Sequence, residues 1–400
     1  MFLLKGLARN VLLLCVVSFF NDISSEMMLA VLPMFITSIG GTGIALGIIS
    51  GLGDSVSSFL KIFSGWWSDR TGKRKPFAFY GYFISCVAKF FFPFAWSWQM
   101  LAVLKPVERV GKGLRDAPRD ALLANSAPSE IRGKVFGLHS GFDTAGAFVG
   151  ALAAFLLFYF WGFSFRAILM LAALTGFAAL VPFFWIKEVS ASQTPDKDRG
   201  LSLKLKGLPA GFIEYILIVS LFSLANFSYM FFVLRSRDCF LVTMPSKLAT
   251  ALPLLLYIWF NAVYTACALP AGMLSDKIGR HAVLCAGYLI FGAACLGFAF
   301  SNSVLSFAAC FAVYGVAYSL IDATQRAFAS DFVPAEKRGT ALGLFHTAVS
   351  VAAFPGGLIA GLLWNAGQRY LFIYGFILAL LSAILIIAVK PRDRLSVSRV

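Results

Sequence analysis

The chain has 400 residues, of which 59% are hydrophobic and only 13% are charged. Ordinary soluble domains carry about 45–50% apolar and about 25% charged residues, so this composition argues against a soluble protein. Apolar runs recur along the whole chain, and each is long enough to cross a bilayer core of about 30 Å. We therefore predict an all-α polytopic membrane protein.

Twelve apolar segments are predicted to span the membrane. In chain order they cover residues 11–37, 43–67, 77–95, 98–119, 132–158, 164–187, 211–234, 248–271, 281–300, 303–329, 338–364 and 369–389. An even number of spans places both termini on one side. Of the 34 Lys and Arg, 14 lie within these bounds, and the other 20 divide into 17 on that side and 3 on the other. The positive-inside rule predicts cytoplasmic termini in the cell inner (plasma) membrane, and a nucleic-acid-binding patch explains this alternation poorly.

The N-terminal segment is similar to a secretory signal, because Lys5 and Arg9 precede an apolar run. No small-residue cleavage site follows, so we interpret the segment as a retained first helix. The seven cysteines show neither a CxxC pair nor metal-ligand spacing. The chain also has no nucleotide-binding loop, HExxH motif or GxSxG motif. We expect no enzymatic activity, no catalytic or metal-binding residues and no cofactor.

The chain is an internal repeat of two sets of six predicted helices. "GWWSDRTGKRK" from Gly65 recurs as "GMLSDKIGRHA" from Gly272, and "RDAPRDALLANSAPSEIRGKVFG" pairs with "IDATQRAFASDFVPAEKRGTALG" at almost the same offset. We predict an N-terminal six-helix bundle over 1–187, a cytoplasmic linker over 188–210 and a C-terminal six-helix bundle over 211–400. Parallel repeats of this kind are related by an axis along the membrane normal.

These motifs resemble the major facilitator superfamily of secondary transporters over essentially the whole chain. The family pattern Gly-x-x-x-Asp-Arg/Lys-x-Gly-Arg/Lys is matched twice, through Gly65, Asp69, Arg70, Gly72, Lys73 and Arg74 and through Gly272, Asp276, Lys277, Gly279 and Arg280. The resemblance implies alternating access between two bundles. We expect a monomer whose partners are the lipid bilayer and a small-molecule solute, with no nucleic acid.

Charges near the cytoplasmic ends of the helices are predicted to act as a conformational latch. Contacts between bundles that form and break would favour the state closed on that side. The predicted latch residues are Asp69, Arg70, Arg74, Arg115, Asp116, Arg119, Asp276, Lys277, Asp322 and Arg326. The alternatives are a topology signal alone for the loops and a static buried network for the fourth helix.

The segment Lys105–Asp120 holds eight charged residues in sixteen positions. On a helix, with about 100° per residue, these charges fall within an arc of about 140°. Facing lipid, each would cost about 2.5–3.5 kcal/mol, or on the order of 20 kcal/mol together, which exceeds typical protein stability. The charged stripe must therefore face protein or water.

The resemblance implies that the first, fourth, seventh and tenth helices line a central cavity, and the stripe lies on the fourth. The predicted solute-binding residues are Asp22, Glu26, Asp54, Lys105, Glu108, Arg109, Lys112, Asn226, Tyr229, Asn261 and Tyr318. Protons are the expected coupling ion, exchanged at Asp22, Glu26, His139 or Asp143. A lone buried His is as often a packing residue as a relay.

Fixed cations beside carboxylates suit a small anionic or zwitterionic solute, because Lys and Arg bind carboxylate and phosphate groups. Carboxylate metabolites, amino-acid-like compounds and metal chelates of the siderophore type all fit. The alternative is a proton-driven multidrug efflux antiporter. Arg109 and Gly113 match a pattern, an Arg with a Gly four residues later, that the resemblance links to proton movement in such antiporters. Lys112 stands at a position of this pattern where Gln is common. Import and export share one architecture, so both directions stay open.

Overall fold

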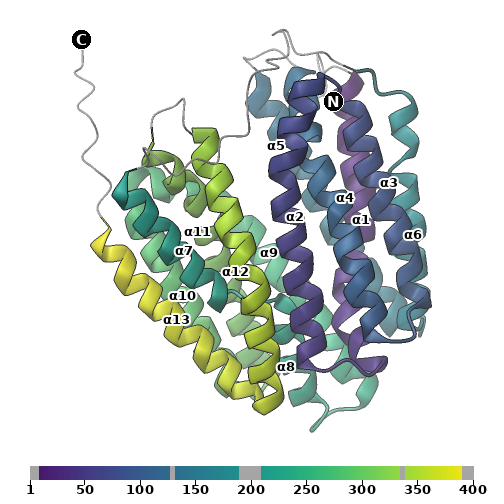
Figure 1. Cartoon of the computed structure of the whole chain (residues 1–400). Helices are drawn as coiled ribbons and strands as arrows, with labels where there is room; N and C mark the ends of the chain where they lie inside the picture. The colour runs from purple at the N-terminus through teal and green to yellow at the C-terminus, as the bar shows by residue number, and fades with distance from the viewer. Residues whose placement is uncertain (1–8, 127–130, 189–208, 334–337, 390–400) are drawn as a thin grey trace. The chain divides into compact units, whose positions relative to one another are not determined.

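The computed structural model describes residues 9–126, 131–188, 209–333 and 338–389 (Figure 1). Within these ranges the side chains at positions 62, 69, 132, 133, 323 and 338–340 are not described. Every regular element in the described ranges is a helix. Residues 127–130 and 334–337 of the second repeated motif, like the central part of the predicted linker, lie outside these ranges.

The two halves of the chain contribute similar sets of helices. The first half contains α1 (Arg9–Ser38), α2 (Gly43–Thr71), α3 (Lys75–Phe91), α4 (Trp98–Asn125), α5 (Arg132–Tyr159) and α6 (Phe165–Ala178), with the 3-10 turns η2 (Phe92–Phe94) and η4 (Val181–Phe184). The second half contains α7 (Ala210–Ala225), α8 (Tyr229–Phe240), α9 (Ser246–Ile278), α10 (Arg280–Phe300), α11 (Val304–Asp331), α12 (Arg338–Ala366) and α13 (Gln368–Ala388).

The predicted twelve-helix membrane fold is confirmed. Eleven segments of the described chain are long and apolar enough to cross a bilayer, with α7 and α8 together forming one of them. The twelfth is α4, whose 28 residues have a length of about 42 Å at about 1.5 Å per residue. Its charged stripe is what sets it apart from the other spans.

The internal repeat is visible in the packing of each half. In the first half α1 packs on α5 and α6, and α3 packs on α4. In the second half α7 packs on α12 and α13, and α10 packs on α11. The described residues pack into two compact units. The first unit contains the described residues of 9–41 and 52–188, and the second contains 42–51 and the described residues from 209 onward.

One loop contact is repeated in both halves. Arg74 donates through Nη1 to the carbonyl oxygen of Ala121 at 3.2 Å, and Arg280 donates through Nη1 to the carbonyl oxygen of Ala327 at 2.8 Å. In each case an Arg at the start of one helix donates to a carbonyl near the end of the following helix. The contact ties α3 to α4 and α10 to α11.

The seventh predicted span is broken, contrary to the prediction of one continuous helix. The segment expected as one helix over 211–234 consists of α7 and α8, separated at residues 226–228. Asn226 leaves the helical conformation with ψ of 64°, and Ser228 begins the new helix by accepting a hydrogen bond from the Met230 N–H at 3.4 Å. Asn and Ser compete with helical hydrogen bonds through their side chains, which explains why the break falls here.

Glycines allow α3 and α4 to approach closely. A Cβ on Gly111 would lie 2.5 Å from Oγ and 2.7 Å from the backbone N of Ser85, and a Cβ on Gly81 would lie 2.7 Å from the carbonyl oxygen of Gly111. Such separations are shorter than van der Waals contact. The same close packing holds the charged face of α4 against polar residues of α3.

We predict that Gly111→Ala separates α3 from α4 and lowers the melting temperature of the purified protein. Overpacking of this kind costs about 1–3 kcal/mol. The control is Gly137→Ala on α5, where an added Cβ meets nothing within 4 Å, so this variant should melt at or slightly above the wild-type temperature. Equal melting temperatures for the two variants would contradict the close packing described here.

Candidate functional site

A cavity of about 310 Å³ lies inside the first unit and collects most of its charged side chains. Five helices, α1 to α5, contribute to its walls. The charged lining residues are Asp22, Glu26, Lys61, Lys89, Lys105, Glu108, Arg109, Lys112, Arg115, Asp116, Arg119 and Asp143. Seven cations therefore face five carboxylates, which leaves a formal excess of positive charge.

One part of the α4 stripe forms ion pairs with Glu108, which is only 3% exposed. Lys105 contacts Glu108 Oε2 through Nζ at 2.9 Å, and the Nε atom of Arg109 lies 3.6 Å from the same oxygen. Arg109 also reaches Asp54 on α2, with 3.8 Å between Nη2 and Oδ1. Asp54 itself does not line the cavity and acts on it through Arg109.

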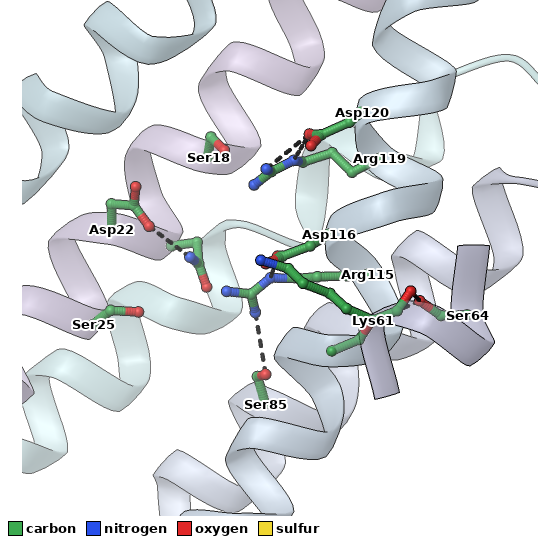
Figure 2. A network of polar contacts seen from close by, with 12 residues as sticks. Ser18, Asp22, Ser25, Lys61, Ser64, Ser85, Arg115, Asp116, Arg119 and Asp120 are labelled. Carbon is green, nitrogen blue, oxygen red and sulfur yellow. Dashed lines mark hydrogen bonds and ion pairs between the residues drawn. The ribbon is translucent and has the colours of Figure 1, made fainter. Parts of the chain in front are cut away.

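The next part of the stripe is paired with residues of α2 and α3 (Figure 2). Lys61 of α2 contacts Asp116 at 2.8 Å. Arg115 donates to Oγ of Ser85 on α3 at 3.1 Å. Its guanidinium carbon lies 4.3 Å from the centre of the Tyr82 ring. The Nε atom of Arg115 is 3.7 Å from Asp116 Oδ1. These contacts satisfy buried charges with partners from neighbouring helices, as a low-dielectric interior requires.

At the far end of the stripe Arg119 pairs with its neighbour in sequence. Nε and Nη2 of Arg119 both contact Oδ1 of Asp120, at 2.9 and 2.8 Å (Figure 2). Arg119 lines the cavity, whereas Asp120 does not. The predicted latch residues Arg115, Asp116 and Arg119 therefore line the same cavity as the residues predicted to bind solute.

The histidine predicted on α5 is engaged through both ring nitrogens. Nδ1 of His139 lies 3.3 Å from Oδ2 of Asp143, and Nε2 lies 3.0 Å from Oγ of Ser18 on α1. Asp143 lines the cavity while His139 lies behind it, 5% exposed. The arrangement connects a cavity carboxylate to a buried hydroxyl through an imidazole.

The second unit brings together fewer of the predicted residues. Asn226, at the break between α7 and α8, shares a small cavity of about 40 Å³ with Tyr318 and Asp322 of α11. Tyr229 and Asn261 are not among the residues that line it. The ring of Tyr229 lies 4.9 Å from that of Tyr257, whose carbonyl accepts a hydrogen bond from Asn261 at 3.0 Å.

Three of the remaining predicted latch residues form ion pairs within the second half. Asp322 pairs with Arg326 at 2.6 Å and Asp276 with Arg280 at 3.8 Å. Arg70 lies over the Trp66 ring at 5.4 Å, and Lys277 is exposed. The Asp69 side chain is outside the described atoms, so its predicted role stays a prediction.

Sequence reasoning missed Lys89 of α3, which is 1% exposed and lines the cavity. Its Nζ donates to Oγ of Ser24 at 3.2 Å and to Oγ of Ser25 at 2.8 Å, both on α1. A Lys within an apolar span is a signal of function by itself, because its insertion is costly. Lys89 has no charged neighbour at helical spacing on its own helix, so the spacing of charges along the sequence does not single it out.

Comparison with known proteins places these features in a family. The Major Facilitator Superfamily profile matches residues 14–254 and 236–399. The chain is 41% identical over 384 residues to an uncharacterized MFS-type transporter of Methanocaldococcus jannaschii, covering 96% of this chain and 95% of that one. It is 29% identical over 192 residues to the multidrug resistance protein MdtH of Proteus mirabilis, covering 46% of each. The fold matches the nucleoside transporter NupG (D323A mutant) with a TM-score of 0.77 at 14% identity, covering 95% of this chain and 100% of that one.

We predict that Glu108→Gln strongly lowers the melting temperature, because Lys105 would keep its charge in a buried position without a carboxylate. Breaking a buried pair costs about 3–5 kcal/mol, whereas replacing both members by apolar residues is often neutral. The double variant Lys105→Met/Glu108→Leu should therefore recover much of the loss. The matched control is Asp276→Asn, whose exposed carboxylate lies 3.8 Å from Arg280 and whose loss should cost less than about 1 kcal/mol. A Glu108→Gln protein as stable as the control would contradict this account.

Proposed function

The chain belongs to the major facilitator superfamily, and on that premise we propose that it moves a small anionic or zwitterionic solute by alternating access, coupled to protons. The observation that carries the proposal is the cavity of the first unit, whose charged lining holds more cations than carboxylates. Lys and Arg form strong charge-assisted hydrogen bonds with carboxylate and phosphate groups. A solute of this kind would replace the water that solvates the lining charges.

The size and mixed charge of the cavity support a compact polar solute. Its volume of about 310 Å³ lies at the lower end of the range of about 300–1,000 Å³ found for small-molecule sites. Asp22 and Glu26 line the cavity from α1, facing the cations of α4. Carboxylate metabolites, amino-acid-like compounds and small metal chelates combine the charges that such walls would bind.

Proton coupling is supported by the contact between Asp143, His139 and Ser18. A carboxylate that lines the solute cavity and contacts a buried imidazole at 3.3 Å is suited to exchange a proton with the solute's bound state. His139 would then relay or stabilise the proton through Nδ1 while Ser18 holds Nε2. In this proposal Asp143 is the residue that couples proton and solute movement.

Multidrug efflux is the second candidate, and an aromatic row in the second unit favours it. The rings of Tyr257, Phe260, Tyr264 and Tyr318 follow one another with centroid separations of 5.8–6.3 Å. Aromatic faces of this kind suit flat amphiphiles and organic cations. The partial similarity to MdtH, a multidrug resistance protein, agrees with this reading. The polar cavity of the first unit favours the anionic or zwitterionic solute.

Transport by reconstituted protein tests the proposal. Proteoliposomes would be screened for uptake of labelled carboxylates, amino acids and lipophilic cations, with and without an imposed pH gradient. We expect a carboxylate-bearing or zwitterionic solute to accumulate when the gradient is present. Asp143→Asn should abolish this accumulation but leave exchange of labelled for unlabelled solute, because exchange needs no net proton movement.

The control variant is Glu214→Gln, which removes an exposed carboxylate on α7, outside the cavity. Accumulation that ignores the pH gradient would overturn proton coupling. Transport restricted to lipophilic cations would overturn the proposed solute class and favour multidrug efflux.

A further inference from the structure

The cations of the cavity are not equivalent, because most already have a carboxylate partner. Ion pairs of 2.8–3.8 Å involve Lys61, Lys105, Arg109, Arg115 and Arg119. A solute anion gains less from a cation whose charge is already offset than from one whose charge is not. The cations without such a partner therefore indicate where an anionic group binds.

Lys89 is the first of these cations. In the described part of the chain its Nζ contacts only the hydroxyls of Ser24 and Ser25, and it forms no ion pair with a carboxylate. An ammonium group has three N–H donors, so one remains for a ligand in the cavity that Lys89 lines. With 1% of the residue exposed, bulk water does little to offset this charge, and an anion would.

Lys112 is the second. It lines the same cavity from α4 and is half-buried. Among the described residues it has no hydrogen bond or ion pair, in contrast to its neighbours on the stripe. Lys89 and Lys112 thus present two positive groups to the cavity from two different helices.

Ser25 adds a neutral donor beside Lys89. Its oxygen accepts from Lys89 at 2.8 Å, and its own O–H is used by no described residue, so it can donate to a ligand. Ser25 also lines the cavity. An ammonium and a hydroxyl held together in this way match the acceptor oxygens of a carboxylate or phosphate.

We propose that Lys89 and Lys112, with the hydroxyl of Ser25, form the subsite that binds the oxyanion of the transported solute. This inference rests on the proposed function and names the atoms that recognise the solute. Asp22 and Glu26 line the same cavity and oppose a second negative charge. The subsite therefore favours a singly charged oxyanion, such as a carboxylate, over a doubly charged phosphate.

Anion-dependent stability of purified protein tests the subsite. Melting temperature would be measured during titration with sodium acetate and with sodium phosphate, against sodium chloride at equal ionic strength. A ligand that binds the native state raises its apparent stability. We expect acetate to stabilise the wild type more than phosphate does, and Lys89→Met and Lys112→Met each to weaken the apparent affinity about tenfold or more. Lys134→Gln, an exposed lysine on α5, should behave as wild type.

Each outcome supports or overturns the subsite. Acetate binding that is equal in Lys89→Met, Lys112→Met and wild type would overturn it while leaving the proposed solute class intact. A stronger effect of phosphate would overturn the preference for a single charge. If buried Lys89→Met fails to fold, half-buried Lys112→Met decides the question by the same comparison. Stabilisation of the wild type by lipophilic cations alone would overturn the proposed function together with the subsite.

Discussion

The cost of holding charge inside a membrane is the constraint on which the rest of this structure depends. Glu108 is 3% exposed and Arg115 is 3% exposed, within a helix that lies among apolar spans. Buried ions of this kind persist only with partners, since desolvation costs several kcal/mol per ion. The first half of the chain supplies such partners from three helices: Lys61 on α2 pairs with Asp116, Ser85 on α3 accepts from Arg115, and Lys105 on α4 itself pairs with Glu108.

This pairing explains both the packing and the site. The small residues Gly81 and Gly111 bring α3 within reach of α4, so that a serine hydroxyl can satisfy an arginine. Pairing is incomplete, however, because Lys89 and Lys112 line the cavity but form no ion pair among the described residues. A purely structural network gains nothing from unpaired buried charge, whereas a binding site for an anion requires it. In the proposed function, these two lysines are the feature that separates a solute site from a static ion network.

The sequence predicted the fold well because membrane spans leave a strong signal in composition and length. Twelve spans, the internal repeat and the inward-facing charges of α4 all follow from hydrophobicity and helical spacing. The break at Asn226 was missed because a single Asn–Phe–Ser step within an apolar run carries little hydropathy signal. Lys89 was missed because its partners, Ser24 and Ser25, lie on another helix, where spacing along one helix cannot reveal them. The contact between His139 and Asp143 was found because it joins residues one turn apart.

Water access to the charged face of α4 tests the central claim most directly. In a background whose seven cysteines are replaced by alanine, Lys112→Cys and Val107→Cys would be treated in lipid vesicles with a charged, membrane-impermeant methanethiosulfonate reagent supplied to both faces. Val107 is 41% exposed on the opposite side of the helix, so it faces lipid or a neighbouring helix instead of the cavity. We predict rapid labelling at position 112 and little labelling at position 107. Labelling at 107 but not at 112 would show that the charged stripe does not line an aqueous cavity.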